Sequence, residues 1–356
     1  MIRIFFLFSC ILCFLPACSE GISGIYINRY AASSSRFYTL VSKMKDSKFN
    51  AAVIDVKYDR GEVGLPLPDE FGFLSSYEKI NDIKEKIDTL KKYNIKPIAR
   101  IVCFKDNILA KTDNYRYALK YSDGELFRDA SGAMWVSPYS DFVRKYLISV
   151  SKKAAECGFE EIQFDYIRYP TDGINGILSF PEHNGMNGFD IVIDFLQEAY
   201  SELKPYGVDI SCDVYGYTVW FDSLHYVMQQ LEGMAQVADI VYPMVYPSHF
   251  SDSLYSSKTK EKRTYDIIFD SGEKSVKRIA RYQTKTVLYL QDFKWKSSKM
   301  GFDYVNNQIK GAIDSGADGF ILWDPSSDYS YFNLDRKENF KDNNDEFDYS
   351  EKAEEP

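Results

Sequence analysis

Two acidic residues stand at matching points of separate apolar segments. Asp165 ends the run Ile-Gln-Phe-Asp, and Asp213 ends the run Ile-Ser-Cys-Asp. Because successive side chains of a strand point to opposite faces, each aspartate shares a face with one polar residue, Gln163 or Ser211. A carboxylate inside a closed barrel is costly unless it is paired, yet it is tolerated near the carboxyl ends of the strands, where barrel enzymes carry their chemistry.

This pair predicts carbohydrate chemistry if its two strands are neighbours. Neighbouring strands lie about 4.8 Å apart, which permits the roughly 5–5.5 Å between the carboxyl groups of a retaining glycosidase. One carboxylate would be the nucleophile and the other the general acid and base. The alternative is structural, since a strand-end aspartate often caps a helix or pairs with an arginine, and Arg168 is three residues from Asp165. Further strand-end aspartates, Asp55 and Asp292, favour a functional cluster.

The elements that would position these groups alternate between strand and helix, the pattern of βα units around a parallel sheet. We expect strands at residues 24–30, 51–57, 95–104, 161–166, 208–214, 239–246, 286–291 and 319–323. We expect helices at residues 33–48, 78–93, 140–157, 188–204, 224–238, 272–282 and 304–315. The sequence thus predicts one α/β domain over residues 24–334, a (β/α)8 TIM barrel whose final helix is weak or missing. A doubly wound sheet is the alternative, but it seldom repeats so regularly.

Several segments around these residues resemble a known family. They are IQFDYIRYPTDG at 162–173, AAVIDVKYDRG at 51–61, PIARIVCFKD at 97–106, SCDVYGY at 211–217, YPMVYPSH at 242–249, LQDF at 290–293 and GFILWD at 319–324. Taken in chain order, they resemble the bacterial "putative glycosyl hydrolase domain" family, barrels related to the α-amylase-type enzymes. The resemblance extends over about residues 24–328 and implies a TIM barrel that hydrolyses glycosidic bonds.

The resemblance also implies roles for single residues. Asp165 takes the position of the strand-four nucleophile of amylase-type barrels. Asp213 takes the strand-five acid/base position, where those enzymes carry the longer Glu. Gln163 stands where amylases place an arginine that supports the nucleophile. Asp292 would be a third carboxylate that grips sugar hydroxyls, although a loop aspartate is more often a helix cap.

Other residues are expected to bind substrate at the mouth of the barrel. Trp323 and Tyr246 would stack on a sugar face, or else are core aromatics beneath a loop. His249 would donate to a hydroxyl, or else is an incidental loop residue. The full set of expected substrate-binding residues is Tyr26, Asp55, Arg100, Gln163, Arg168, Tyr215, Tyr246, His249 and Trp323.

Composition argues against several other classes of protein. The formal charge is −9 and no basic stripe is present, so nucleic acid is not an expected partner. The three histidines are scattered and no CxxC pair occurs, so neither a metal nor a cofactor is expected. The apolar surroundings of Cys103, Cys157 and Cys212 favour buried free thiols over a disulfide.

Both ends of the chain differ from the middle. Residues 1–17 join one arginine to an apolar run too short to span a membrane, which predicts a signal peptide. The segment Leu-Pro-Ala-Cys ending at Cys18 resembles the bacterial lipobox, so Cys18 is expected to carry a lipid anchor, with residues 18–23 as its linker. An ordinary cleaved signal is the alternative. Residues 335–356 hold nine acidic and four basic residues, typical of a disordered spacer.

The sequence therefore predicts an exported, membrane-anchored glycoside hydrolase or transglycosylase on the periplasmic face or the cell surface. Its substrate would be an oligo- or polysaccharide, cut by a retaining two-carboxylate mechanism. The alternative is a carbohydrate-binding surface lipoprotein without catalytic activity, for which Gln163 and the short side chain of Asp213 argue. A barrel enzyme of another chemistry is less favoured. The oligomeric state, the sugar and its linkage are not indicated by the sequence.

Overall fold

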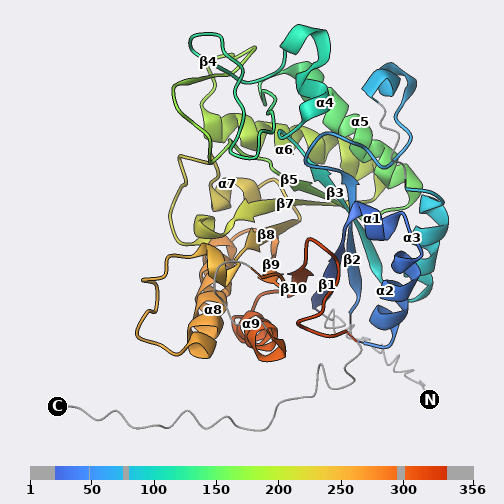
Figure 1. Ribbon diagram of the computed structural model, residues 1–356, viewed down its shortest axis with the longest axis vertical. Helices are drawn as coiled ribbons and strands as arrows, with labels where there is room; N and C mark the ends of the chain where they lie inside the picture. The colour runs from blue at the N-terminus through green and yellow to red at the C-terminus, as the bar shows by residue number, and fades with distance from the viewer. Residues whose placement is uncertain (1–20, 48, 75–79, 295–300, 335–356) are drawn as a thin grey trace, which may run out of the picture.

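The computed structural model of the chain describes residues 21–47, 49–74, 80–294 and 301–334. Eight parallel strands close into a barrel in the order β1-β10-β9-β8-β7-β5-β3-β2, and helices surround it (Figure 1). This confirms the predicted (β/α)8 TIM barrel. The predicted signal peptide at residues 1–17, the lipid site Cys18 and the acidic tail at residues 335–356 lie outside the described residues.

The barrel strands are short and mostly buried. They are β1 (Ile22–Ile27), β2 (Ala51–Lys57), β3 (Lys96–Val102), β5 (Glu161–Asp165), β7 (Asp209–Tyr215), β8 (Ile240–Met244), β9 (Lys285–Gln291) and β10 (Gly319–Trp323). A separate antiparallel pair, β4 (Lys120–Tyr121) and β6 (Leu178–Ser179), joins the loops that follow β3 and β5. Strand β1 begins two residues before the predicted start because Ile22 pairs with Gly319 of β10, so the predicted linker at residues 18–23 ends inside the barrel.

The helices follow the strands around the outside. They are α1 (Arg29–Ala32), α2 (Arg36–Lys45), α3 (Ile83–Lys92), α4 (Asn107–Ala110), α5 (Asp141–Cys157), α6 (Gly188–Leu203), α7 (Leu231–Ala235), α8 (Lys260–Ile279) and α9 (Phe302–Asp314). Between β10 and Leu334, where the described chain stops, the residues form turns and no helix. None of the helices in the described ranges has the length and apolarity needed to cross a lipid bilayer.

Three predicted helices differ from the observed ones. The helix expected at residues 33–48 is observed as the shorter α2, and the short α1 comes before the expected start. The helix expected at residues 224–238 is only the short α7, because Leu224 and Gln229 exchange backbone hydrogen bonds in a turn. Helix α8 begins at Lys260, within a predicted loop. The sequence pattern missed this first part because the buried face of α8 includes polar residues, Thr264 and Ser271, which a search for apolar residues at helical spacing does not register.

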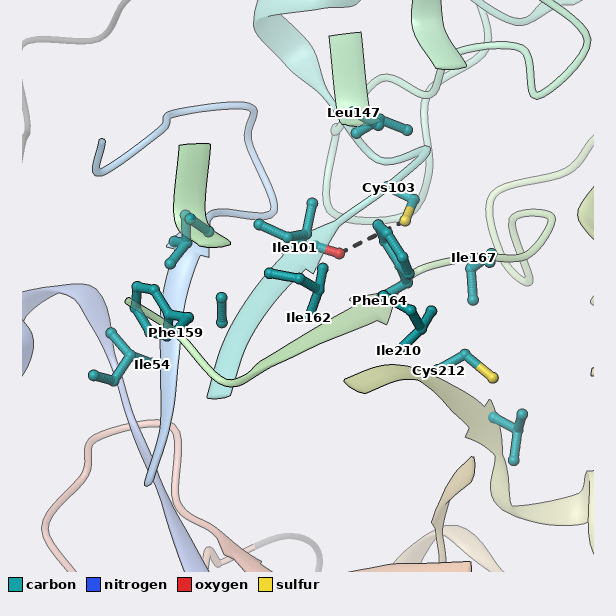
Figure 2. Close-up of a cluster of buried hydrophobic side chains, with 14 of the residues drawn as sticks. Ile54, Ile101, Cys103, Leu147, Phe159, Ile162, Phe164, Ile167, Ile210 and Cys212 are labelled. Atoms are coloured by element: carbon teal, nitrogen blue, oxygen red, sulfur yellow. Dashed lines mark hydrogen bonds between the residues drawn. The ribbon is translucent and has the colours of Figure 1, made fainter. Parts of the chain in front are cut away.

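The barrel wall separates two apolar layers. Outward-facing residues such as Phe164 and Cys212 pack with residues of the surrounding helices, among them Leu147 of α5 (Figure 2). Inward-facing residues, including Tyr242 and Tyr289, fill the barrel. This alternation confirms the predicted division of faces along β5 and β7. All three cysteines in the described part of the chain are buried and free, as expected.

Candidate active site

Asp165 and Asp213 lie at neighbouring positions at the carboxyl ends of β5 and β7. The two strands pair in parallel and their register joins Phe164 to Cys212, so the aspartates occupy the next pair of positions. Their exposed fractions are only 4% and 1%. The structure thus brings together the two carboxyl groups that the sequence singled out.

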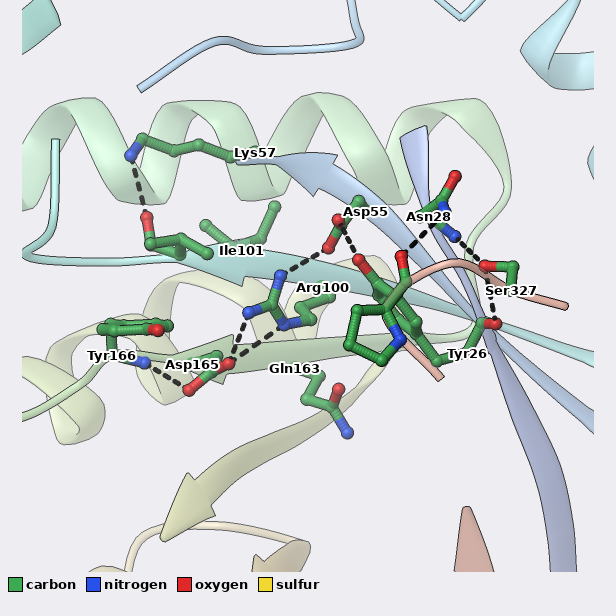
Figure 3. Close-up of polar contacts among 12 residues, drawn as sticks. Tyr26, Asn28, Asp55, Lys57, Arg100, Ile101, Gln163, Asp165, Tyr166 and Ser327 are labelled. Atoms are coloured by element: carbon green, nitrogen blue, oxygen red, sulfur yellow. Dashed lines mark hydrogen bonds and ion pairs between the residues drawn. The ribbon is translucent and has the colours of Figure 1, made fainter. Parts of the chain in front are cut away.

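Arg100 of β3 holds Asp165 on one side and Asp55 of β2 on the other (Figure 3). Its Nε and Nη2 donate to Oδ2 of Asp165 at 3.0 and 2.6 Å, and its Nη1 donates to Oδ1 of Asp55. The hydroxyl of Tyr26 donates to the second oxygen of Asp55. Burial alone would lower the pKa of Arg100, but the charges of Asp55 and Asp165 outweigh it and raise this pKa well above its usual value. Arg100 is therefore a fixed positive charge beside Asp165.

The backbone of Tyr166 fixes the second oxygen of Asp165. The Tyr166 N–H donates to Oδ1 at 2.6 Å, and Tyr166 has a φ of +50°, which is uncommon for a bulky residue. Such strain persists only where the surroundings enforce it, commonly at functional sites. Here Lys105 and Arg168 both contact the Tyr166 ring, at 5.2 and 4.8 Å from its centroid. The carboxylate of Asp165 is consequently oriented by three nitrogen donors.

The surroundings of Asp213 are different. Both of its carboxyl oxygens are shielded from solvent, and no donor in the described part of the chain hydrogen-bonds them. Burial, reinforced by the charge of Asp165, holds the pKa of Asp213 well above its usual value. Neighbouring carboxyl groups with such unlike environments are suited to separate roles, one as a charged group and one as an acid.

These groups face a cavity of about 880 Å³, a volume typical of ligand sites. The expected site residues that line it are Arg100, Asp165, Arg168, Asp213, Tyr215, Tyr246, His249 and Trp323. Its wall also carries the aromatic residues Tyr166, Tyr217, Phe250, Tyr289, Phe293 and Tyr331. Aromatic rings beside a few polar groups match the alternating apolar faces and hydroxyls of a sugar. Among the described residues, no group of His, Cys, Asp and Glu is arranged to hold a metal ion.

Three expected substrate-binding residues support the lining instead of belonging to it. Tyr26 stacks on Trp323 with ring centroids 3.8 Å apart. Asp55 pairs with Arg100. Gln163 accepts a hydrogen bond from the hydroxyl of Tyr289 at 2.6 Å. These residues position Trp323, Arg100 and Tyr289, so their effect on a substrate is indirect.

Asp292 lies behind the cavity wall. It is fully buried and is not among the lining residues. Burial, together with the charge of Asp324, raises the pKa of Asp292 to about 8. Contact between Asp292 and a sugar would require this wall to open, and the role of third carboxylate stays a prediction.

Gln229 is a residue of the site that the sequence did not single out. Its Nε2 donates to the backbone carbonyls of Asp213 and Ile167 at 3.1 and 3.3 Å, and its Oε1 accepts from the Tyr215 N–H at 2.8 Å. It is 1% exposed, and it joins the ends of β5 and β7. Because Gln229 falls inside a predicted helix, only a break in that helical pattern could have drawn attention to it.

A closed βα barrel with two unlike carboxyl groups at the ends of neighbouring strands, facing an aromatic cavity, defines a glycoside hydrolase of the TIM-barrel class. Residues 24–329 match the family model described as "Putative glycosyl hydrolase domain". The chain belongs to this family, as the sequence motifs indicated. No curated protein matches the chain significantly.

Solved structures show the same fold. The glycoside hydrolase domain of PgaB (BpsB) from Bordetella bronchiseptica is 12% identical with a TM-score of 0.63, over 86% of this chain and 95% of that chain. The endo-1,4-β-D-mannanase from Thermotoga petrophila RKU-1 is 12% identical with a TM-score of 0.55, over 85% and 88%. The spore cortex-lytic enzyme SleL from Bacillus megaterium is 12% identical with a TM-score of 0.52, over 92% and 75%. At these identities the likeness concerns the fold alone.

Proposed function

We propose that this chain is a retaining glycoside hydrolase of oligo- or polysaccharides in which Asp165 is the nucleophile and Asp213 the general acid and base. The observation that carries the proposal is the contrast between the two carboxyl groups. Arg100 and the Tyr166 N–H bind Asp165, whereas burial raises the pKa of Asp213 and so keeps a proton on it. Adjacent strands about 4.8 Å apart fit the short separation that a retaining mechanism needs.

The reaction would follow two displacements. An oxygen of Asp165 attacks the anomeric carbon while Asp213 gives its proton to the departing glycosidic oxygen, which leaves a glycosyl ester on Asp165. Asp213, now a carboxylate, takes a proton from water, whose oxygen attacks the same carbon and releases Asp165. Arg100 stabilises the carboxylate of Asp165 as it departs in the second step.

Arg100 also bears on the inactive alternative. The resemblance to amylase-type barrels would place the supporting arginine at Gln163, and its absence there favours a binding protein. Arg100 is the register partner of Gln163 on the neighbouring strand, and it donates directly to Asp165. An arginine supplied from β3 in this way supports catalysis.

The test is cleavage of a defined panel of α-glucans, mannan, chitin oligosaccharides and peptidoglycan, measured as new reducing ends. We expect wild type to cut one of them and Asp165→Asn to bind it without cutting. Identical behaviour of both proteins on every glycan would overturn the enzymatic proposal in favour of a binder. NMR of the first anomer released tests the mechanism, since an inverted product would exclude retention.

We further propose that the protein is exported and anchored through a lipid on Cys18, on the basis of the lipobox-like segment. Wild type should sediment with membranes and incorporate a palmitate analogue. Cys18→Ser should do neither. A wild-type protein that is soluble and unlabelled would overturn the anchor without affecting the proposed reaction.

A further inference from the structure

A row of aromatic rings leads out of the cavity along the loop that follows β7. Tyr215 and Tyr217 line the cavity. Tyr226 meets Tyr215 edge-on with ring centroids 5.8 Å apart, and Phe221 lies 6.0 Å from Tyr217. Tyr226 and Phe221 are 50% and 54% exposed. The rings therefore connect the cavity with the outer surface, and we name these four residues the aromatic platform.

The loop that carries the aromatic platform is held firmly. The Tyr169 N–H donates to the carbonyl of Val227 at 3.0 Å, which ties the loop to the segment after β5. Gln229 joins the same loop to the backbone of Asp213 and Tyr215. Large rings exposed on a fixed loop do not add to the buried core, and contiguous exposed apolar groups commonly mark a binding site. A ring that is already fixed loses little entropy when a ligand stacks on it.

Arg168 adds a polar group beside the rings. It lines the cavity, and its guanidinium lies 5.3 Å from the centroid of Trp135. Burial raises the pKa of Tyr215 and of Tyr226, and the positive charge of Arg168 opposes both shifts. The Nη1 of Arg168 donates to the Tyr169 carbonyl at 2.8 Å, so its charge is held at the cavity wall that Tyr215 and Tyr217 also line.

We infer that the aromatic platform binds sugar units beyond the one that meets Asp165, so that the substrate is a chain of several sugars and not a disaccharide. The inference rests on the proposed function. The ligand of the platform is the rest of the same substrate chain, because two platform residues, Tyr215 and Tyr217, line the cavity itself. Aromatic rings favour sugars that can place a broad apolar C–H face on them. Such contacts should lower KM for long chains more than for short ones.

The experiment compares chain lengths. The probes are malto-, manno- and chito-oligosaccharides of two to eight units. In the series that is cut, kcat/KM of wild type should rise with length, and Tyr226→Ala should lower it about three- to tenfold on the octamer, mainly through KM. The disaccharide and trisaccharide should be affected little. Tyr226→Trp keeps a ring and should restore the length dependence.

Tyr206→Ala is the matched control. Tyr206 is also an exposed tyrosine, at 43%, but it precedes β7 and so lies at the opposite end of the barrel. This variant should behave as wild type on every length. If wild type cuts the trimer and the octamer equally well, the inference that the platform binds further sugar units is overturned while the hydrolase proposal stands. The same holds if Tyr226→Ala lowers kcat/KM on both lengths to the same extent. If wild type neither cuts nor binds any of the three series or the polysaccharide panel, both proposals fail.

Discussion

Arg100 binds Asp165 through two nitrogens to a single oxygen, with Nε at 3.0 Å and Nη2 at 2.6 Å from Oδ2. Its third nitrogen, Nη1, is turned to Asp55, whose other oxygen accepts from Tyr26. The position of one carboxylate on β5 thus depends on side chains of β1, β2 and β3. Because this row is buried, a change at its centre affects both folding and chemistry.

Replacing Arg100 should separate these two effects. Arg100→Met leaves Asp55 and Asp165 buried without their shared counter-charge, which should cost about 3–5 kcal/mol of unfolding free energy. Arg100→Lys keeps a charge but loses the planar fork, so it should be destabilised less and still lose about 100-fold in kcat. Urea unfolding and steady-state kinetics measure the two quantities. A lysine variant with wild-type kcat would contradict the positioning role of Arg100.

Asp213→Asn should show whether this carboxyl group is the acid. We expect kcat to fall about 10²- to 10⁴-fold on glycans, and much less on a dinitrophenyl glycoside, whose leaving group needs no proton. In wild type, kcat should fall as the pH rises through the raised pKa of Asp213, because the acid then loses its proton. The same falling limb in Asp213→Asn would assign the titration to another group.

The strands could be predicted because their pattern is local. The predicted bounds of β2 and β10 agree with the structure, and alternation alone placed Gln163 and Asp165 on the inner face. The partner of Asp165 could not be predicted in the same way. Arg168 is nearer in sequence, yet the ion pair is formed by Arg100, because β3 pairs with β5 in a register that no local pattern encodes.

The loops explain the remaining differences. Residues 224–230 have apolar residues at helical spacing, but the Gln229 side chain satisfies three backbone groups of β7 and the β5 loop. These tertiary hydrogen bonds outweigh the local helical preference. Tyr226, which the predicted helix included, stands in this loop instead and is 50% exposed.

Asp292 should make the stability of the protein depend on pH. Its pKa is about 8 in the folded protein against 3.8 for the ordinary group, so between about pH 4 and pH 8 the folded state keeps a proton that the unfolded state releases. Stability from this group is therefore fully present below about pH 4 and is lost as the pH rises to about 8. Asp292→Asn cannot ionise, so its Tm relative to wild type should increase across this window.

The size of this effect can be bounded. Each unit of pKa displacement corresponds to about 1.4 kcal/mol, so even one unit should separate the Tm values by about 2 °C at pH 8. Asp222→Asn, at an exposed position on the loop after β7, is the control and should show no such trend. A constant Tm difference between pH 4 and pH 8 would mean that Asp292 does not hold its proton in the folded protein.

Gln229 and Gln308 allow a matched comparison of two buried glutamines. Gln308 of α9 accepts from the Gln291 N–H at 2.8 Å and donates to the Gln291 carbonyl at 2.9 Å, much as Gln229 serves Tyr215 and Asp213. Replacing either with leucine leaves backbone groups unsatisfied and should cost about 1–3 kcal/mol of unfolding free energy. Only Gln229→Leu should also lower kcat, because its contacts fix the backbone of Asp213 and Tyr215, which line the cavity, whereas Gln308 holds Gln291, which does not. Equal losses of stability with equal kcat values would show that Gln229 serves folding alone, and a kcat loss confined to Gln229→Leu would establish it as a positioning residue for the acid.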